Sequence, residues 1–391
     1  MVSVDEEQQK ATNMEPKAKQ DQFMAEITAE DKAHFKAITN QKLTAEQAQI
    51  IRTPPGVYPK EKTILAVHWH PEFIPIPLIK ERIEATFPNA TEHLIIPTQH
   101  NQLMVYDDYA GVEVDCYSPE FNTKVQLLLH FHPSKLENAT VLRSMLEHTF
   151  NYRGGQLFNF LHALTSDTSE FVLQKAAAKT GANTEVVRFV TGIAKKLLGM
   201  IESAEVDVPK DAIKNKLIRN YLDQLRTPEN DEFINRSQIF LNAVKNQVKQ
   251  EFDLSYFYTT QEIIEETRGL GGCIVIPHPE QFWPILLADY DVDGIEIWNP
   301  QSRRYTDFLI NVVDRQNKSA RANKEPLLIF MGDDTHFGEK TKVGNSQNRD
   351  KVTREVGVQP PWNDLAVKKT LIQARSEKLQ VIARYKERLN A

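Results

Sequence analysis

Cysteine is almost absent from this sequence. Its 391 residues include only two, Cys116 and Cys273, which lie far apart in the chain. This number excludes a disulfide framework and a zinc site built from thiolates. Because each cysteine lies within an apolar run, we expect both to be small residues of the core.

Long apolar runs and an excess of positive charge are also absent. No run approaches the roughly 20 apolar residues that a membrane-spanning helix needs, so we expect no membrane partner. The net charge is -6, and a mildly acidic chain makes nucleic acid a less favoured partner. The first residues, MVSVDEEQQKATNMEPKAKQ, are charged and lack the apolar middle of a signal peptide, which leads us to expect a cytoplasmic protein.

Composition divides the chain into a polar N-terminal region, a strand-rich region in two parts, a helical insert between those parts and a C-terminal helical extension. The first thirty or so residues are polar, and helical patterning begins near Thr28 and Thr44, each followed by a Glu as in a capping box. The insert is far longer than the dozen or so residues of one crossover helix, so it is either a lid or a packing element. The predicted bounds are 1–60 for the N-terminal region, 61–137 and 269–345 for the strand-rich region, 138–268 for the insert and 346–391 for the extension.

Seven short runs rich in Val, Ile and Leu have the length of strands. They do not alternate apolar with polar residues, which is typical of a parallel sheet buried on both faces. Amphipathic helical stretches fall between several of them, so we expect an α/β fold, for which a closed barrel is one natural solution. The runs are TILAV (63–67), HLIIP (93–97), GVEV (111–114), VQLLL (125–129), CIVIP (273–277), GIEIW (294–298) and PLLIFM (326–331).

Histidines and carboxylates gather at these runs. In a parallel barrel the carboxyl ends of the strands converge on one face, so residues that follow the strands would meet there. Imidazole and carboxylate without thiolate suit Zn, Mn or Fe, and we therefore predict a cluster of metal ions. The residues are His68 and His70 after the first run, His100 after the second, Glu113 within the third, His130 and His132 after the fourth, His278 after the fifth, and Asp334 and His336 after the last.

Four of the 11 histidines stay outside this prediction. His93 precedes its strand and would face the opposite end of a barrel. His34, His148 and His162 lie on helical patterns, where surface or core roles are expected.

The order of these motifs resembles the PHP superfamily, which is named for polymerase-associated and histidinol-phosphatase domains. The motifs are H-x-H, TQHN, GVEV, a His after a strand, PHP and GDDTH, and the resemblance covers residues 62–340 without the insert. It implies a distorted (β/α)7 TIM-like barrel, a centre of two or three divalent metal ions, and hydrolysis of phosphoesters.

Carried over by position, the resemblance implies a set of metal ligands in which Glu113 bridges two ions. His130 is the ligand expected after the fourth strand, with His132 as its rival. The stretch HWHPEFIP departs from the family after its first motif, Glu72 is a further candidate ligand there, and Asp333 replaces the usual Ser. The full set is His68, His70, His100, Glu113, His130, His278, Asp334 and His336.

The predicted function is therefore metal-dependent hydrolysis of a phosphate ester, of a small molecule or nucleotide, by a metal-activated hydroxide. We expect His132 to protonate the leaving group and Arg303 or Arg304 to bind the phosphate. Asn299 is a candidate to support a ligand, and the side chain of Glu296 could face either the barrel interior or a helix.

Two alternative functions use the same residues. An amidohydrolase-like metal hydrolase also opens with H-x-H, but that family typically ends its metal set with a lone Asp. A non-catalytic, metal-stabilised binding module is the other alternative, although a complete ligand set argues against a decayed site. The sequence carries no signal for an oligomeric state.

Overall fold

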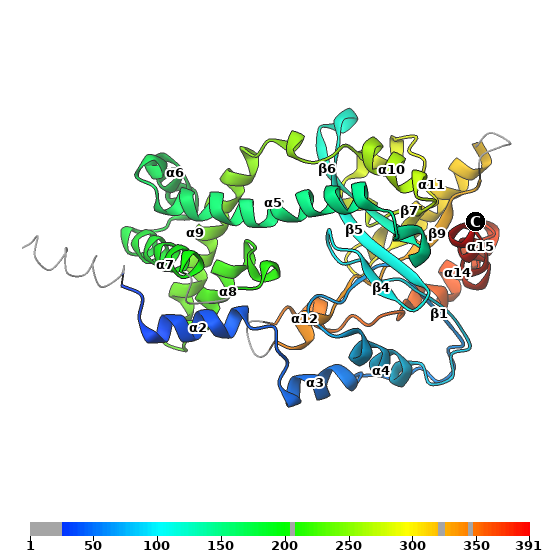
Figure 1. Cartoon of the computed structure of the whole chain (residues 1–391), viewed down its shortest axis with the longest axis horizontal. Helices are drawn as coiled ribbons and strands as arrows, with labels where there is room; N and C mark the ends of the chain where they lie inside the picture. Colours follow the sequence, from blue (N-terminus) through cyan, green and yellow to red (C-terminus); the bar gives the residue numbers. More distant parts are fainter. Residues whose placement is uncertain (1–25, 204–207, 320–324, 343–346) are drawn as a thin grey trace, which may run out of the picture. The chain divides into compact units, whose positions relative to one another are not determined.

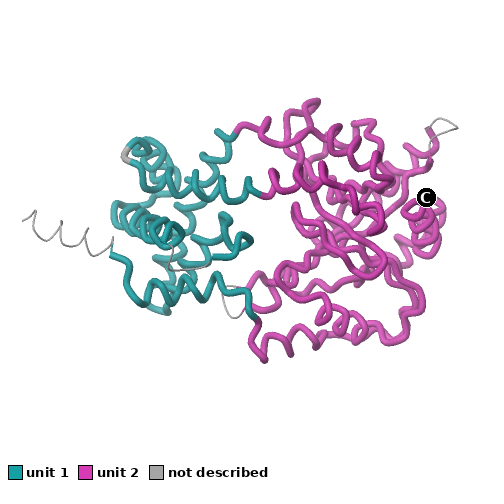
Figure 2. The backbone as a smooth tube through the Cα atoms, in the orientation of Figure 1, with its two compact units in different colours: residues 1–42, 151–252 teal, residues 43–150, 253–391 magenta. Residues whose placement is uncertain are grey.

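The computed structural model describes residues 26–203, 208–319, 325–342 and 347–391 (Figure 1). The polar tail expected at the N-terminus falls mostly on residues 1–25, outside the described residues. The chain divides into two compact units, shown in Figure 2: unit 1 comprises residues 1–42 and 151–252, and unit 2 comprises residues 43–150 and 253–391.

Unit 1 is helical. Its N-terminal helix joins the same hydrophobic core as the helices of the predicted insert, because Phe35 is fully buried there with Leu197, Tyr221 and Phe240. Unit 1 therefore has narrower bounds than the predicted insert and includes a segment that the sequence assigned to the N-terminal region. Its helices are α2 (Ala29–Thr39), the second part of α5 (Thr140–Thr165), α6 (Glu170–Thr180), α7 (Thr184–Glu202), α8 (Lys216–Gln224) and α9 (Asp231–Gln250).

Capping boxes start three helices of the described residues, and the sequence predicts those at Thr28 and Thr44. Thr28 exchanges hydrogen bonds with Asp31 at the start of α2, and Thr259 does so with Glu262 at the start of α10 (Thr260–Gly269). At the start of α3 (Ala45–Arg52) the box joins Thr44 to Gln47. In each box, two backbone N–H groups at the start of the helix gain a side-chain acceptor that an uncapped helix would not provide.

Asp31 also lies at the centre of a buried polar network in unit 1. Its carboxylate accepts hydrogen bonds from the Tyr221 hydroxyl at 2.6 Å and the Lys196 ammonium at 2.8 Å. Burial alone would raise the pKa of Asp31, but the hydrogen bonds from Lys196, Tyr221 and Thr28 outweigh burial and lower the pKa to about 2.

This lowered pKa predicts how the stability of unit 1 depends on pH. A carboxyl group whose pKa is lower in the folded state stabilises that state above its unfolded pKa, and the stabilisation is lost as the pH falls through the folded value. Asp31 should therefore contribute about 2 kcal/mol at pH 7, most of it lost between pH 4 and pH 2. In urea denaturation, Asp31→Asn should lose about this amount at pH 7 and show less acid sensitivity. The exposed neighbour variant Glu30→Gln is the control, and equal behaviour of the two would contradict the assignment.

Unit 2 contains the strands, which form three sheets in the described residues. Strand β1 pairs with β3, β2 pairs with β10, and the other six follow the order β4-β5-β6-β7-β8-β9. All seven predicted strands are confirmed, while the short strands β2, β4 and β10 were not predicted. The bounds are β1 (Thr63–Ala66), β2 (Trp69–His70), β3 (Glu92–Ile95), β4 (Met104–Tyr106), β5 (Tyr109–Ser118), β6 (Thr123–Phe131), β7 (Cys273–Ile276), β8 (Gly294–Trp298), β9 (Leu328–Met331) and β10 (Thr335–His336).

The direction of β6 corrects the expectation of a wholly parallel sheet. Strands β7, β8 and β9 are parallel to one another, but β6 is antiparallel to both β5 and β7. The carboxyl end of β6 therefore lies at the edge of the sheet opposite to the carboxyl ends of β5, β7 and β8. The pairings of the described residues contain no closed ring of strands, so the barrel stays a prediction.

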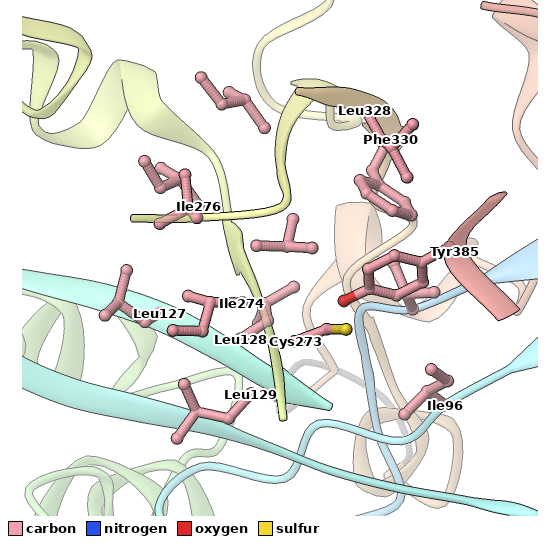
Figure 3. Close-up of a cluster of buried hydrophobic side chains, with 14 of the residues drawn as sticks. Ile96, Leu127, Leu128, Leu129, Cys273, Ile274, Ile276, Leu328, Phe330 and Tyr385 are labelled. Carbon is pink, nitrogen blue, oxygen red and sulfur yellow. The ribbon is translucent and has the colours of Figure 1, made fainter. Parts of the chain in front are cut away.

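Helices and a core of aliphatic and aromatic side chains complete unit 2. Figure 3 shows Leu127, Leu129, Cys273 and Phe330 in this core, with Tyr385 from the last helix among them. The predicted C-terminal extension is thus part of unit 2. Both cysteines are free and buried, as expected. The remaining helices are α4 (Ile76–Thr86), α11 (Thr306–Ser319), α12 (Phe337–Lys340), α13 (Arg349–Val352), α14 (Leu365–Gln373) and α15 (Lys378–Asn390), and no helix in the described ranges is long and apolar enough to cross a membrane.

A buried ion cluster ties three separate segments of unit 2 together. The guanidinium of Arg82 donates two hydrogen bonds to the Glu355 carboxylate, both at 2.7 Å, and the Lys340 ammonium donates a third at 2.7 Å. Arg82 also donates to the carbonyl oxygens of Ile50, Ile51 and Thr53 at the end of α3. The three charged side chains are 3–6% exposed, so the cluster is cut off from water.

Candidate metal centre

Backbone pairing brings the candidate ligands together from distant parts of unit 2. The short strands β2 and β10 run parallel with His70 directly opposite His336, and their rings stack with centroids 4.3 Å apart. The amide of Asp334 donates to the carbonyl oxygen of His68 at 2.9 Å. An isolated bridge pairs His100 with Glu113.

Seven of the eight predicted ligands form three overlapping groups whose donor atoms lie within 4.8 Å of one another. His68 and His70 each belong to two groups, so the groups make one continuous cluster. Two of the groups combine histidine with a carboxylate and the third is all histidine, and divalent metal ions accept both kinds of donor. The groups are His70, His100 and His336; His68, Glu113 and His278; and His68, His70 and Asp334.

The two carboxylates of the cluster each face several histidines. Glu113 directs Oε1 toward Nε2 of His278 at 3.4 Å and Oε2 toward Nδ1 of His100 at 2.6 Å, so its two oxygens face different parts of the cluster. Asp334 directs Oδ1 toward Nε2 of His70 at 3.3 Å and of His336 at 3.1 Å. This arrangement fits Glu113 as a bridge between two ions.

Buried ring nitrogens provide an independent test of whether these residues fit a metal ion. Both nitrogens of His70 and Nε2 of His68 are buried and make no hydrogen bond. A buried polar atom without a partner is costly, and native structures rarely keep one without a reason. A cation bound by these nitrogens would satisfy them, so the residues present fit a metal ion.

The pKa shifts of three residues of the cluster also fit a metal site. Burial alone would raise the pKa of Glu113, but the charge and hydrogen bond of His100 hold it well below the usual range. The same balance, with His336 and His70 as partners, keeps the pKa of Asp334 low. Burial and the neighbouring imidazoles of His336 and His100 lower the pKa of His70. Ionised carboxylates and a neutral imidazole are the forms that bind metal.

Backbone strain concentrates at the same place. Asp334 has φ +47°, His278 has φ +26° and Glu72 has φ +52°, values that residues other than glycine rarely adopt. Such conformations cost about 1–3 kcal/mol each and tend to persist at functional sites. Three such residues therefore lie at this cluster, while Asp107, Asn122 and Arg375 have positive φ elsewhere in unit 2.

The side chain of Glu296 faces the cluster and contacts His68 and the backbone of His278. Its Oε1 lies 3.1 Å from Nδ1 of His68, and its Oε2 accepts the backbone N–H of His278 at 2.5 Å. A carboxylate on Nδ1 fixes the ring orientation of His68 and leaves Nε2 to face a metal ion. Burial would lower the pKa of His68, but the charges of Glu296, Asp334 and Glu113 outweigh it and raise the pKa to about 10.

We expect Glu296→Gln to weaken metal binding by about 10–100-fold, the usual effect of losing a hydrogen-bond partner behind a ligand. Gly332→Ala should act in the same direction, because a Cβ there would lie 1.1 Å from Oε1 of Glu296. Calorimetric titration of metal into chelator-treated protein measures both. Gly269→Ala is the control, since a Cβ at Gly269 meets no atom within 4 Å. Unchanged affinity in Glu296→Gln would show that His68 needs no such support.

His130 is the predicted ligand that the structure does not bring to the cluster. It pairs with Cys273 at the start of β7, whereas His278 follows the other end of that strand. Its Nε2 lies 3.1 Å from the carbonyl oxygen of Val67, and its Nδ1 lies 2.7 Å from the hydroxyl of Tyr385. Because both nitrogens have protein partners, His130 has no lone pair for a metal ion, and the prediction that it is a ligand is corrected.

His132 also lies apart from the cluster, because it follows the reversed strand β6. Its Nδ1 lies 2.8 Å from the hydroxyl of Ser134. It caps the short 3-10 helix Pro133–Leu136. The structure therefore does not support His132 as a proton donor at the cluster or as a substitute ligand.

Of the other candidates, Glu72 contacts a residue of the cluster. Glu72 has Oε1 3.4 Å from Nδ1 of His336. Arg303 lines a cavity described below, whereas the guanidinium of Arg304 lies over the Tyr305 ring at 4.6 Å. Asn299 is buried and accepts the backbone N–H of Gln301 at 3.1 Å.

Two cationic side chains at the cluster were not predicted. The ammonium of Lys351 lies 2.9 Å from Nε2 of His336. Arg354 donates from Nη1 to Asp334, at 2.5 Å to Oδ2 and 3.1 Å to the carbonyl oxygen. Both lie in the segment after the GDDTH motif, which has no apolar run or motif to mark them.

Comparisons with known proteins add little to this picture. No protein-family model matches the chain, and no curated protein matches it. Among solved structures it is similar to a proposed metal-dependent phosphoesterase from Bifidobacterium adolescentis, with 15% identity and a TM-score of 0.39 over 82% of this chain and 98% of that chain. Because this similarity is too low to show a shared fold, the proposal below rests on the side chains alone.

Proposed function

We propose that this protein is a metal-dependent phosphoesterase of the PHP type that hydrolyses a small phosphate ester. The observation that carries the proposal is the convergence of seven predicted ligands into overlapping groups that share His68 and His70. Their order along the chain is that of the PHP motifs. We also propose that the strands of unit 2 form the distorted barrel that this resemblance implies.

The residues of the cluster have distinct roles in this proposal. Because Glu296 contacts Nδ1 of His68, Nε2 of His68 would bind a single ion, either with Glu113 and His278 or with His70 and Asp334. His70, His100 and His336 would be available for a further ion. Such ions, Zn, Mn or Fe, would lower the pKa of a bound water and polarise phosphoryl oxygens. Glu113, with its two oxygens turned to different histidines, would be able to contact more than one ion.

Lys351 supplies a positive charge at the edge of the cluster. Its ammonium lies beside His336, and a charged donor at that place can bind a phosphoryl oxygen or give a proton to a departing oxygen. This role replaces the one that the sequence suggested for His132. Its three N–H groups are suited to an oxyanion, because ammonium donors form short, strong hydrogen bonds with phosphate.

The test is phosphate release by metal-loaded protein from a panel of phosphoesters, paired with elemental analysis. We expect hydrolysis of at least one small phosphomonoester, with loss of both metal and activity in Asp334→Asn. A protein that holds its metal ions but releases no phosphate from any ester would exclude this function.

A further inference from the structure

A cavity of about 650 Å³ in unit 2 adjoins the candidate metal centre. Its lining includes Asp333, which precedes Asp334 in the chain. It also includes Gln301 and Arg354, which both bind the side chain of Asp334. The volume is within the roughly 300–1,000 Å³ of small-molecule sites and far exceeds the space that a phosphoryl group alone would fill.

Asp334 connects the cavity to the cluster. Its Oδ1 faces the histidines, while its Oδ2 accepts hydrogen bonds from Arg354 at 2.5 Å and from Gln301 at 3.1 Å. The Asp334 carboxylate therefore has Oδ1 on the side of the cluster and Oδ2 on the side of the cavity. A molecule that reached the metal ligands from this cavity would pass along Arg354 and Gln301.

Two arginines lie on the wall of the cavity, of which Arg354 already binds Asp334 through Nη1. Arg354 is only 6% exposed, and its Nε is buried without a hydrogen-bond partner. Arg303 is exposed on the same lining. Fork-shaped guanidinium groups match the geometry of carboxylates and phosphates better than other side chains do.

The acidic groups on the lining are mostly engaged by the protein itself. Glu355 is bound by Arg82 and Lys340 in the buried ion cluster. Asp333 accepts the backbone N–H groups of Gly357 at 3.0 Å and of Thr335 at 3.3 Å. Asp350 is exposed. The apolar part of the lining comes from Trp298, Pro300, Val358 and Pro360.

We propose that this cavity binds the leaving group of the substrate and that Arg303 and Arg354 bind a second anionic group on it. The substrate class is then a small phosphate ester that also carries a carboxylate or a further phosphate. This inference rests on the proposed function for the position of the reacting phosphoryl group, and it adds the chemistry of the remainder of the molecule.

Two neighbouring arginines allow a matched test. Arg303 lines the cavity, whereas Arg304 lies over Tyr305, and the two differ by one position in the same 3-10 helix, Arg303–Tyr305. Because both are exposed, Arg303→Met and Arg304→Met should fold normally. Arg354 is less suitable for substitution, since its loss would also disturb Asp334.

The probes are pairs of esters that differ in the second anionic group. 3-Phosphoglycerate and glycerol 3-phosphate differ by a carboxylate, and fructose 1,6-bisphosphate and fructose 6-phosphate differ by a phosphate. For at least one pair, metal-loaded wild-type protein should bind and hydrolyse the more anionic member about tenfold better, the effect of one charged hydrogen bond. Arg303→Met should remove this preference and Arg304→Met should keep it.

The outcomes separate the two proposals. Hydrolysis without preference in either pair, or a preference that survives in Arg303→Met, would overturn the cavity proposal and leave the phosphoesterase function standing. Preferential binding seen by calorimetry, with no hydrolysis of any ester in the wider panel, would support the cavity and exclude the function. Failure of wild-type protein to bind any of the four esters would overturn the cavity proposal, and phosphate release from the wider panel would still decide the function.

Discussion

Replacing His68 with alanine should lower the metal content and reduce activity to the background rate, because it takes a donor from two of the three overlapping ligand groups. The imidazole belongs both to the group with Glu113 and His278 and to the group with His70 and Asp334. Loss of a ligand should cost more than the about 10–100-fold that follows loss of a supporting hydrogen bond. Elemental analysis and metal titration give the direct measurement.

A comparison with His100 makes this prediction specific. His100 belongs to one group and is partly exposed, so His100→Ala should lower the metal content less than His68→Ala does. His93→Ala is the control for loss of an imidazole, because His93 is exposed on β3 and belongs to no ligand group. Full metal content in His68→Ala would refute the proposed ligand set.

Replacing Glu355 with glutamine should give the largest loss of stability. The substitution leaves Arg82 and Lys340 buried, 4% and 3% exposed, without the carboxylate that both bind. Breaking a buried ion pair in this way costs about 3–5 kcal/mol, because an uncompensated charge stays out of water. Burial already lowers the pKa of Lys340, although the Glu355 charge opposes this effect.

Urea denaturation of the full chain measures this loss, and a second substitution tests its cause. Adding Lys340→Met to Glu355→Gln removes one of the two stranded cations, so the double variant should recover part of the lost free energy of unfolding. Glu387→Gln, at an exposed position of α15, should change the free energy of unfolding by less than about 0.5 kcal/mol. No recovery in the double variant would assign the loss to packing instead.

Local features of the fold were predictable from the sequence because they depend on neighbouring residues. The seven apolar runs form strands, and Thr28, Thr44 and Thr259 cap their helices. These outcomes follow from β-branched composition and from hydrogen bonds that reach only three residues along the chain.

The direction of β6 was predicted wrongly, as parallel, and this explains the error at His130. A continuous apolar run such as VQLLL has the same pattern in a parallel and in an antiparallel strand. The connection from Ser118 to Thr123 carried the missing signal, because only residues 119–122 separate β5 from β6. A parallel connection needs a dozen or more residues, so this turn requires a hairpin and a reversed β6.

The cluster itself was predictable because most of its residues follow predicted strands, while Glu113 lies within one. The pairing of β2 with β10 then sets His70 beside His336. Lys351 and Arg354 were not predictable, because their contacts depend on how the segment after His336 folds back, which no local pattern encodes. Glu296 lies within a predicted strand, but the side of the sheet to which its side chain points depends on the register of β8.

The interrupted course of unit 2 has a consequence for how the protein matures on the ribosome. Residues 151–252 of unit 1 separate His68, His70, His100 and Glu113 from His278, Asp334 and His336. At about 5–20 residues per second, synthesis from Glu113 to His278 takes on the order of ten to thirty seconds. Every ligand group includes at least one residue from the later set. Loading of the proposed metal ions would therefore be a late event, completed only after residues 151–252 have emerged from the exit tunnel.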